Sequence, residues 1–269
     1  MQSKTHLFKN NLITVIIALY LVVPILFTFI YSLFKEWTDI LPTGFTLSAY
    51  AKIFSDPKYW ETVWHSLILS IIPTVLCALV IILAMYYVTV YNPAFAKVMQ
   101  IVCTIPYAVQ GVIIAIAILS LYANAPGIFS SRLFMICGTY CICILPYMYS
   151  GIKNSLDGIN AKMLIDAAEM LGCGRFYAYC HVIVPNIIQG ITISSLLSLA
   201  ILFGDFVMIN ILAGNYFTTT QIYLYQMMKK SGTTSCAITV VLFCITFMLT
   251  AVVQLIQNKN HAGIAQSQT

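Results

Sequence analysis

Six long runs of this sequence contain no Asp, Glu, Lys or Arg, and they strongly limit the folds open to the chain. The runs are residues 10–34, 62–96, 98–131, 133–152, 176–204 and 231–258. Each reaches or exceeds the roughly 20 apolar residues that a helix needs to cross a bilayer. The pattern therefore predicts an all-α, polytopic membrane protein with six transmembrane helices.

Composition supports the same class. Of the 269 residues, 61% are hydrophobic and 8% are charged, whereas soluble domains carry roughly 25% charged residues. The formal net charge of +5 is no sign of nucleic-acid binding, because Lys and Arg in a membrane protein report topology and contact with lipid head groups. We therefore expect a lipid bilayer, and no nucleic acid, among the partners.

The predicted helices lie at about 11–34, 63–90, 98–122, 131–152, from Asn186 onward, and 235–257. The loop over 35–62 carries acidic residues and is expected to hold a short helix near Ser48–Phe54, and the segment 215–234 is polar and rich in Thr. We divide the chain into an N-terminal helix with an external loop (1–62), a core domain (63–258) and a polar tail (259–269).

The segment from Asn160 to Pro185 mixes charged and small residues between two apolar runs. Asn160 is a good N-cap, because its side chain accepts a hydrogen bond from a free backbone N–H. Apolar residues then recur at helical spacing up to Gly172, which can adopt the left-handed conformation that ends a helix. Pro185 suits the first turn of a new helix. The segment is predicted to form a short amphipathic helix, a sharp turn and re-entry into an apolar run.

This segment resembles the cytoplasmic loop of binding-protein-dependent ABC importer permeases. The family pattern is Glu-Ala-Ala, three residues, Gly, and then a fixed stretch to Ile-x-Leu-Pro. The matching positions here are Asp166, Ala167, Ala168, Gly172, Val182, Val184 and Pro185. Asp replaces Glu, and Val replaces both Ile and Leu, so each departure keeps the charge or the hydrophobicity. The alternative is an ordinary helix and turn that merely links two spans.

The resemblance covers roughly residues 45–258 and implies the type I ABC importer permease fold. It further implies a coupling loop at about 153–185, whose contacts with a cytoplasmic ATPase would be made by Asp166, Ala167, Ala168, Glu169, Gly172 and Pro185. The implied partners are ATP-binding cassette subunits, a second permease subunit that is identical or different, and an extracytoplasmic solute-binding protein. The implied location is the bacterial inner membrane.

The distribution of positive charge does not fix the topology by itself. With the N-terminus inside, seven of the 13 Lys and Arg residues lie inside and six outside, which is no useful bias under the positive-inside rule. The resemblance of the loop determines the expected topology, because a loop of this kind must face a cytoplasmic ATPase. Both termini are then expected in the cytoplasm.

Three stretches bear on the substrate: EWTDILPTGFTL, FGDFVMINILAG and TTTQIYLY. They resemble permeases for 2-aminoethylphosphonate and, next, those for spermidine/putrescine and ferric iron. This resemblance favours 2-aminoethylphosphonate among small polar solutes.

Three polar residues inside predicted spans are candidates for the substrate pathway: Asp205, Asn210 and Gln110. A carboxylate at membrane depth is costly and is expected to face a cavity or a partner, and Gly204 beside Asp205 indicates a break in the fifth helix. Asp205 either contacts the solute or is structural, capping the broken helix or pairing with Lys229 or another subunit. Interhelical hydrogen bonding is the alternative for Asn210 and Gln110.

The sequence contains no G-x-x-x-x-G-K-[ST] motif, so we expect ATP hydrolysis by a partner subunit and no enzymatic activity of this chain. The Cys141-x-Cys143 pair lacks nearby His or acidic partners, and we predict no metal site and no cofactor. The alternative function is an ion-coupled secondary transporter or channel subunit, which would be expected to show inverted repeats or several buried ionisable residues. A membrane-embedded enzyme is disfavoured, because no catalytic cluster is evident.

Overall fold

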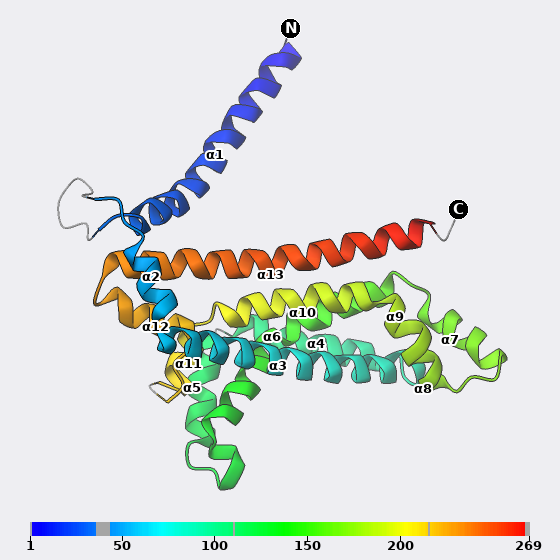
Figure 1. Cartoon of the computed structure of the whole chain (residues 1–269). Coiled ribbons are helices and arrows are strands. Elements are labelled where there is room, and N and C mark those ends of the chain that lie inside the picture. Colours follow the sequence, from blue (N-terminus) through cyan, green and yellow to red (C-terminus); the bar gives the residue numbers. More distant parts are fainter. Residues whose placement is uncertain (1, 36–43, 110, 215, 267–269) are drawn as a thin grey trace. The chain divides into compact units, whose positions relative to one another are not determined.

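The computed structural model describes residues 2–35, 44–109, 111–214 and 216–266, and the principal elements in this part of the chain are helices. They are α1 (Gln2–Ser32), α2 (Ser48–Ser55), α3 (Pro57–Val90), α4 (Phe95–Ala108), α5 (Gly111–Tyr122), α6 (Arg132–Asp157), α7 (Ala161–Met170), α8 (Arg175–Ala178), α9 (Val184–Asn186), α10 (Ile188–Phe203), α11 (Val207–Leu212), α12 (Thr220–Met228) and α13 (Gly232–Gln266), as Figure 1 shows. A 3-10 turn (Gly127–Ser130) precedes α6, and a π-helical turn (Tyr179–Ile183) lies between α8 and α9.

Two of the described helices, α3 and α6, are each long and apolar enough to cross a membrane. Two bent pairs pass the same test together: α4 with α5, which differ in direction by 100°, and the segment Arg175–Asn186 with α10, which differ by 67°. Shorter apolar stretches lie in α1 and α13. The all-α prediction is confirmed, and the prediction of six spans is compatible with these helices, of which two, or four with the bent pairs, are long and apolar enough to cross a membrane.

The prediction of one continuous helix over 98–122 was wrong. The chain forms α4 and α5 instead, on either side of residue 110, which lies outside the described residues. Pro106 sits in the last turn of α4, where it removes a backbone donor, and Val109 is extended, with φ −109° and ψ 121°. Apolar periodicity is similar in a straight and a broken helix, so the run alone concealed the bend.

Some helix boundaries also differ from the sequence expectation. The helix expected from about 63 begins at Pro57, a residue that favours the first turn of a helix, and the helix expected to end near 152 continues to Asp157. The polar segment 215–234 contains the unpredicted helix α12. The short helix near Ser48–Phe54 is confirmed as α2, and the predicted break near Gly204 is confirmed between α10 and α11.

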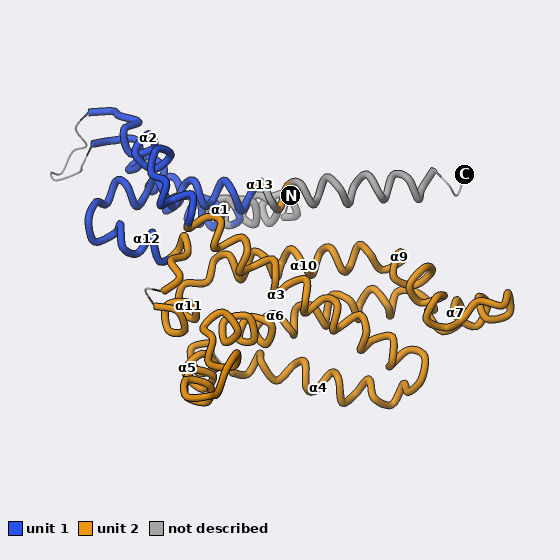
Figure 2. Tube along the Cα trace, turned by 60° about the horizontal axis from the view of Figure 1, so that its bottom comes forward, with its two compact units in different colours: residues 1–61, 222–247 blue, residues 62–221, 248–269 orange. Residues whose placement is uncertain are grey.

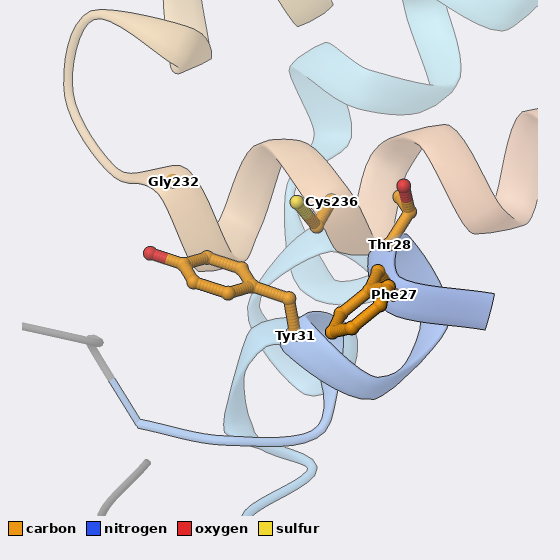
Figure 3. A pocket seen from close by; sticks show the side chains of 5 residues that line it. All are labelled: Phe27, Thr28, Tyr31, Gly232 and Cys236. Carbon is orange, nitrogen blue, oxygen red and sulfur yellow. The ribbon is translucent and has the colours of Figure 1, made fainter. Parts of the chain in front are cut away.

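The chain divides into two compact units, coloured separately in Figure 2. Unit 1 comprises Met1–Glu61 and Ile222–Phe247. Within it, the Tyr223 hydroxyl donates a hydrogen bond of 2.6 Å to the Asp56 carboxylate. An apolar hollow of about 570 Å³ is lined by Phe27, Thr28 and Tyr31 of α1 and by Gly232 and Cys236 of α13 (Figure 3).

Unit 2 comprises Thr62–Gln221 and Met248–Thr269 and is built around α6. Side chains at every fourth position of α6 are almost completely buried: Ile136, Tyr140, Ile144, Met148 and Ile152. Residues four apart lie on one face of a helix, and this face of α6 packs into the unit, where α10 and α4 are its neighbours.

Small residues bring α6 and α10 into close contact. A Cβ atom added at Gly151 of α6 would lie 2.5 Å from the Cβ of Ser194 on α10, and one added at Gly190 of α10 would lie 1.8 Å from the Oγ of Ser155 on α6. Each helix thus contributes a Gly-x-x-x-Ser pair, and each glycine meets the serine of the other helix. Small residues at such positions let membrane helices approach closely. This contact joins the two helices that flank the α7 loop.

Candidate functional site

The first candidate site is the loop that carries α7. The Oδ1 of Asn160 accepts a hydrogen bond of 3.4 Å from the backbone N–H of Met163, so the predicted N-cap is confirmed. Ala161 and Ile165 are buried and hold one side of the helix against the protein. Gly172 has φ +84°, which favours glycine, and the N–H of Cys173 donates to the carbonyl of Ala168 over 3.0 Å. The predicted helix and turn are therefore present.

The opposite side of α7 presents small and apolar groups to the surroundings. Met163, Ala167 and Met170 follow at spacings of four and three, which places them on one face. The exposed fraction is 89% for Met170 and 85% for the adjacent Leu171. Apolar side chains gathered on an exposed surface commonly mark an interaction site.

The remaining loop candidates surround this face. Asp166 and Gly172 are exposed, whereas Ala168 and Glu169 are partly buried. Glu169 forms an ion pair with Arg175 of α8, and their second hydrogen bond, from the Arg175 Nη2 to the Glu169 Oε2, measures 3.4 Å. This pair bridges the turn at Gly172. Pro185 lies farther along the chain, exposed in the first turn of α9, as the sequence predicted.

An aromatic cluster connects this loop to α3. The ring of Tyr86 on α3 lies 5.3 Å from that of Phe176 and 5.1 Å from that of Tyr179, centroid to centroid. The Tyr179 hydroxyl also donates to the carbonyl of Ile82 over 3.0 Å. Tyr179 begins the π-helical turn, a distortion that is frequent at functional sites. Nothing in the sequence indicated that α3 supplies a partner for these aromatic residues of the loop.

The second candidate site is the break between α10 and α11. The Asp205 carboxylate accepts hydrogen bonds from the backbone N–H of Met208 (3.4 Å), that of Ile209 (3.1 Å) and the hydroxyl of Tyr140 (3.0 Å). A carboxylate at the start of a helix satisfies free N–H groups and interacts favourably with the helix dipole. This geometry corresponds to the capping alternative for Asp205. Lys229, the other suggested partner, instead has its ammonium 4.5 Å from the centre of the Tyr225 ring.

The other end of α11 is held by a cation that the sequence reasoning missed. The guanidinium of Arg132, at the start of α6, donates to the carbonyl of Leu212 over 2.9 Å and lies 4.5 Å from the centre of the Tyr216 ring. A cation at the carboxyl end of a helix complements the carboxylate at its amino end. Asn210 is exposed on α11, and Gln110 lies outside the described residues. Asp205 thus lies just before this short helix and Asn210 within it.

The comparison with protein families identifies the chain. A model of the family described as "Binding-protein-dependent transport system inner membrane component" matches residues 77–261, which is more than half of the sequence. The chain belongs to this family. It is a permease subunit of an ABC importer, and such permeases are not enzymes themselves.

Curated relatives are also permeases. Over 237 residues, the permease is 22% identical to the putative 2-aminoethylphosphonate transport system permease protein PhnV of Salmonella typhimurium, with 88% of this chain and 89% of the relative covered. Over 196 residues, it is 23% identical to the spermidine/putrescine transport system permease protein PotB of Haemophilus influenzae, with 67% and 68% covered. A third relative is the thiamine transport system permease protein ThiP of Escherichia coli, 21% identical, with 78% of this chain and 40% of the relative covered.

Solved structures show the same fold. A bacterial ABC transporter that imports the acidic polysaccharide alginate superposes with a TM-score of 0.74 at 15% identity, with 95% of this permease and 97% of that chain covered. The MetNI methionine ABC transporter, in an inward-facing conformation, gives a TM-score of 0.60 at 17% identity, with 75% and 97% covered. The predicted ABC importer permease fold is confirmed.

The described part of the permease offers no ready metal site, because no three of its His, Cys, Asp and Glu side chains gather in a group that could hold an ion. Its two candidate sites instead differ in kind. The α7 loop presents an accessible apolar face, whereas the Asp205 carboxylate is occupied by the polar groups around it.

Proposed function

We propose that this permease, with its core at residues 63–258, works within a complete ATP-driven importer. A second permease subunit, identical or different, completes the pathway, and an extracytoplasmic solute-binding protein delivers the solute. ATP-binding cassette subunits dock at the α7 loop, on the cytoplasmic side, where both termini also lie. The solute is small and polar, with 2-aminoethylphosphonate the first candidate, and polyamine or ferric iron the next.

The exposed face of α7 is the observation that carries this proposal. Ala167 gives the helix a narrow ridge, and Met163, Met170 and Leu171 surround it with apolar surface. Burial of apolar surface contributes about 25 cal/mol per Å² to association, and a methyl side chain at Ala167 allows the helix to enter a groove. Asp166 and Gly172, which match the family pattern, lie beside this face.

The contacts around the loop explain how it would pass force into the membrane. The pair Glu169–Arg175 fastens α7 to α8, and the loop as a whole connects α6 to α10. Because Gly151 and Gly190 hold those helices in close contact, a displacement of α7 moves both together. Binding and hydrolysis of ATP in the partner would thus tilt a rigid pair of helices, while the breaks near Pro106 and Gly204 serve as flexible points.

The choice of solute rests on the relatives. The alignment with the 2-aminoethylphosphonate permease covers 88% of this chain, and that with the polyamine permease covers 67%. Only 8% of the residues of this permease are charged. A pathway with few charges is compatible with 2-aminoethylphosphonate, a zwitterion that carries both an ammonium and a phosphonate group.

Reconstitution tests the proposal directly. The permease would be co-expressed with candidate ATPase, sister-permease and solute-binding subunits, purified, and inserted into liposomes. We expect the ATPase to co-purify and uptake of labelled 2-aminoethylphosphonate to require internal ATP. Uptake by liposomes that contain this chain without an ATPase would refute the coupling, and labelling of α7 from the external side would refute the topology.

A further inference from the structure

Helix α4 has three different faces. Met99 and Cys103 are buried where α4 packs against α6. An apolar face remains exposed and is formed by Val98, Ile101, Val102 and Ile105, each between 48% and 64% exposed. Such a face is suited to lipid chains or to another apolar surface.

The third face of α4 is polar and exposed. It consists of Lys97, Gln100, Thr104 and Tyr107, which follow at spacings of three, four and three and so share one side of the helix; we call it the α4 polar stripe. Lys97, Gln100 and Thr104, together with Ile101, line a hollow of about 410 Å³. At the C-terminal end of the stripe, the centre of the Tyr107 ring lies 5.2 Å from that of the Tyr147 ring on α6.

The α4 polar stripe favours a polar neighbour. An amide such as that of Gln100 is costly inside a membrane when it faces lipid chains, whereas Lys97, in the first turn of α4, can extend to the membrane surface. Here α4 keeps its apolar residues on one exposed face and its polar residues on another. This separation is expected where one face meets lipid and the other meets an aqueous path.

The charge around the stripe selects the kind of solute. Residues 62–156 contain Lys97, Arg132 and Lys153 and not a single Asp or Glu. The carboxylate of Asp205 follows directly after the apolar run 176–204, and its oxygens already accept three hydrogen bonds. Residues 62–156 therefore offer a polycation no counter-charge, whereas Lys97, Gln100 and Tyr107 can all donate to an anionic oxygen.

We propose that the α4 polar stripe lines the solute pathway and hydrogen-bonds the anionic oxygens of a small oxyacid solute, such as a phosphonate. This inference rests on the proposed function, since it assumes an ATP-driven pathway, and it names the group of the solute that is recognised. Thr104 already donates its hydroxyl to the carbonyl of Gln100 over 2.6 Å, so it keeps the stripe polar at the middle of α4 without donating to the anionic oxygens.

Transport by the reconstituted complex tests the assignment. Gln100→Leu, which removes a donor, and Lys97→Gln, which removes a positive charge, are each expected to raise the KM for 2-aminoethylphosphonate uptake about tenfold or more. Lys97→Arg retains the charge and is expected to retain transport. Val102→Thr, a change on the apolar face of the same helix, is the matched control and is expected to leave uptake unchanged.

Chemical access distinguishes an aqueous path from a protein interface. In the assembled complex, Thr104→Cys is expected to react with a charged thiol reagent and to be protected by excess solute, whereas Val102→Cys is expected to stay unreactive. Mass spectrometry locates the label among the native cysteines. An unreactive Cys at 104 would mean that a second subunit covers the stripe, and would overturn the inference.

The two proposals fail in different ways. If the unaltered complex shows no ATP-dependent uptake, the proposed function is wrong. If that complex imports solute and Gln100→Leu, Lys97→Gln and Val102→Thr all do so equally well, the function stands and the pathway assignment is wrong. Uptake of putrescine in preference to phosphonate by the unaltered complex would overturn the assigned solute class alone.

Discussion

A Cβ atom added at Gly190 would lie 1.8 Å from the Oγ of Ser155, closer than any pair of non-bonded atoms can approach. Rotation of the serine would not relieve the clash, because the Cβ of Ser155 and the carbonyl of Gly151 would still lie 2.6 and 3.0 Å from the added atom. α10 and α6 therefore touch backbone to backbone at this point. Because the α7 loop connects these two helices, their contact limits how far the two ends of the loop can move relative to each other.

Gly190→Ala is expected to destabilise the permease, because overpacking of a close contact typically costs about 1–3 kcal/mol. Gly138→Ala is the matched control on α6, where an added Cβ would meet nothing within 4 Å. Alanine favours a helix over glycine by roughly 1 kcal/mol, so this control is expected to be neutral or stabilising. Thermal unfolding of the purified proteins compares them, and an equal midpoint for both variants would contradict the packing argument.

Gly172 and Gly174 offer a second matched comparison, within the loop. Both have open space around an added Cβ, but Gly172 has φ +84° whereas Gly174 has φ −69°. An L-residue in the left-handed region costs roughly 1–2 kcal/mol, so Gly172→Ala is expected to disturb the turn after α7 and to reduce solute-stimulated ATP hydrolysis. Gly174→Ala is expected to leave it unchanged. Equal effects of the two substitutions would show that backbone conformation at residue 172 is unimportant.

The helices of this protein could be predicted from its sequence because apolar runs and local signals determine them. The charge-free runs located the apolar helices, Asn160 and Gly172 bounded α7 correctly, and Gly204 marked the break before α11. These features depend on residues close together in the chain, so a reader of the sequence can recognise them.

The remaining features depend on contacts between distant residues. The bend between α4 and α5 leaves the apolar pattern unchanged, and Val109 gives no signal of its extended backbone. Arg132 is separated by 80 residues from the Leu212 carbonyl that it holds, and Tyr86 by 90 or more from Phe176 and Tyr179. For Asp205 the sequence indicated a functional or a structural carboxylate, and only the positions of Tyr140 and the α11 backbone favour the second.

Asp205 is expected to act mainly through the stability of α11. In Asp205→Asn the remaining side-chain oxygen still accepts from the backbone, since Asn and Asp cap helices about equally well, and folding and solute selectivity are expected to change little. Asp205→Ala removes the cap, at about 0.5–2 kcal/mol, and leaves the buried Tyr140 hydroxyl without this acceptor, at about 1–3 kcal/mol. A lower unfolding midpoint is expected. Altered selectivity in Asp205→Asn at unchanged stability would instead indicate direct contact with solute.

Ala167→Trp tests whether the apolar face of α7 enters a groove in the ATPase. The exposed position accepts the larger ring in the isolated permease, so membrane insertion and the unfolding midpoint are expected to stay as in the unaltered protein. Docking requires the methyl-sized ridge, so co-purification of the ATPase and solute-stimulated hydrolysis are expected to be lost.

Lys162→Trp supplies the control for this substitution, because Lys162 is exposed on α7 but lies away from the face of Met163, Ala167 and Met170. The same added volume there is expected to leave ATPase binding intact. Loss of binding in both variants would indicate general disturbance of the loop. Normal uptake by Ala167→Trp would show that α7 does not insert into its partner, because a groove that fits a methyl group cannot accommodate an indole ring. Comparing Ala167→Trp with Lys162→Trp thus distinguishes a loss of docking at the apolar face from a general loss of stability of α7.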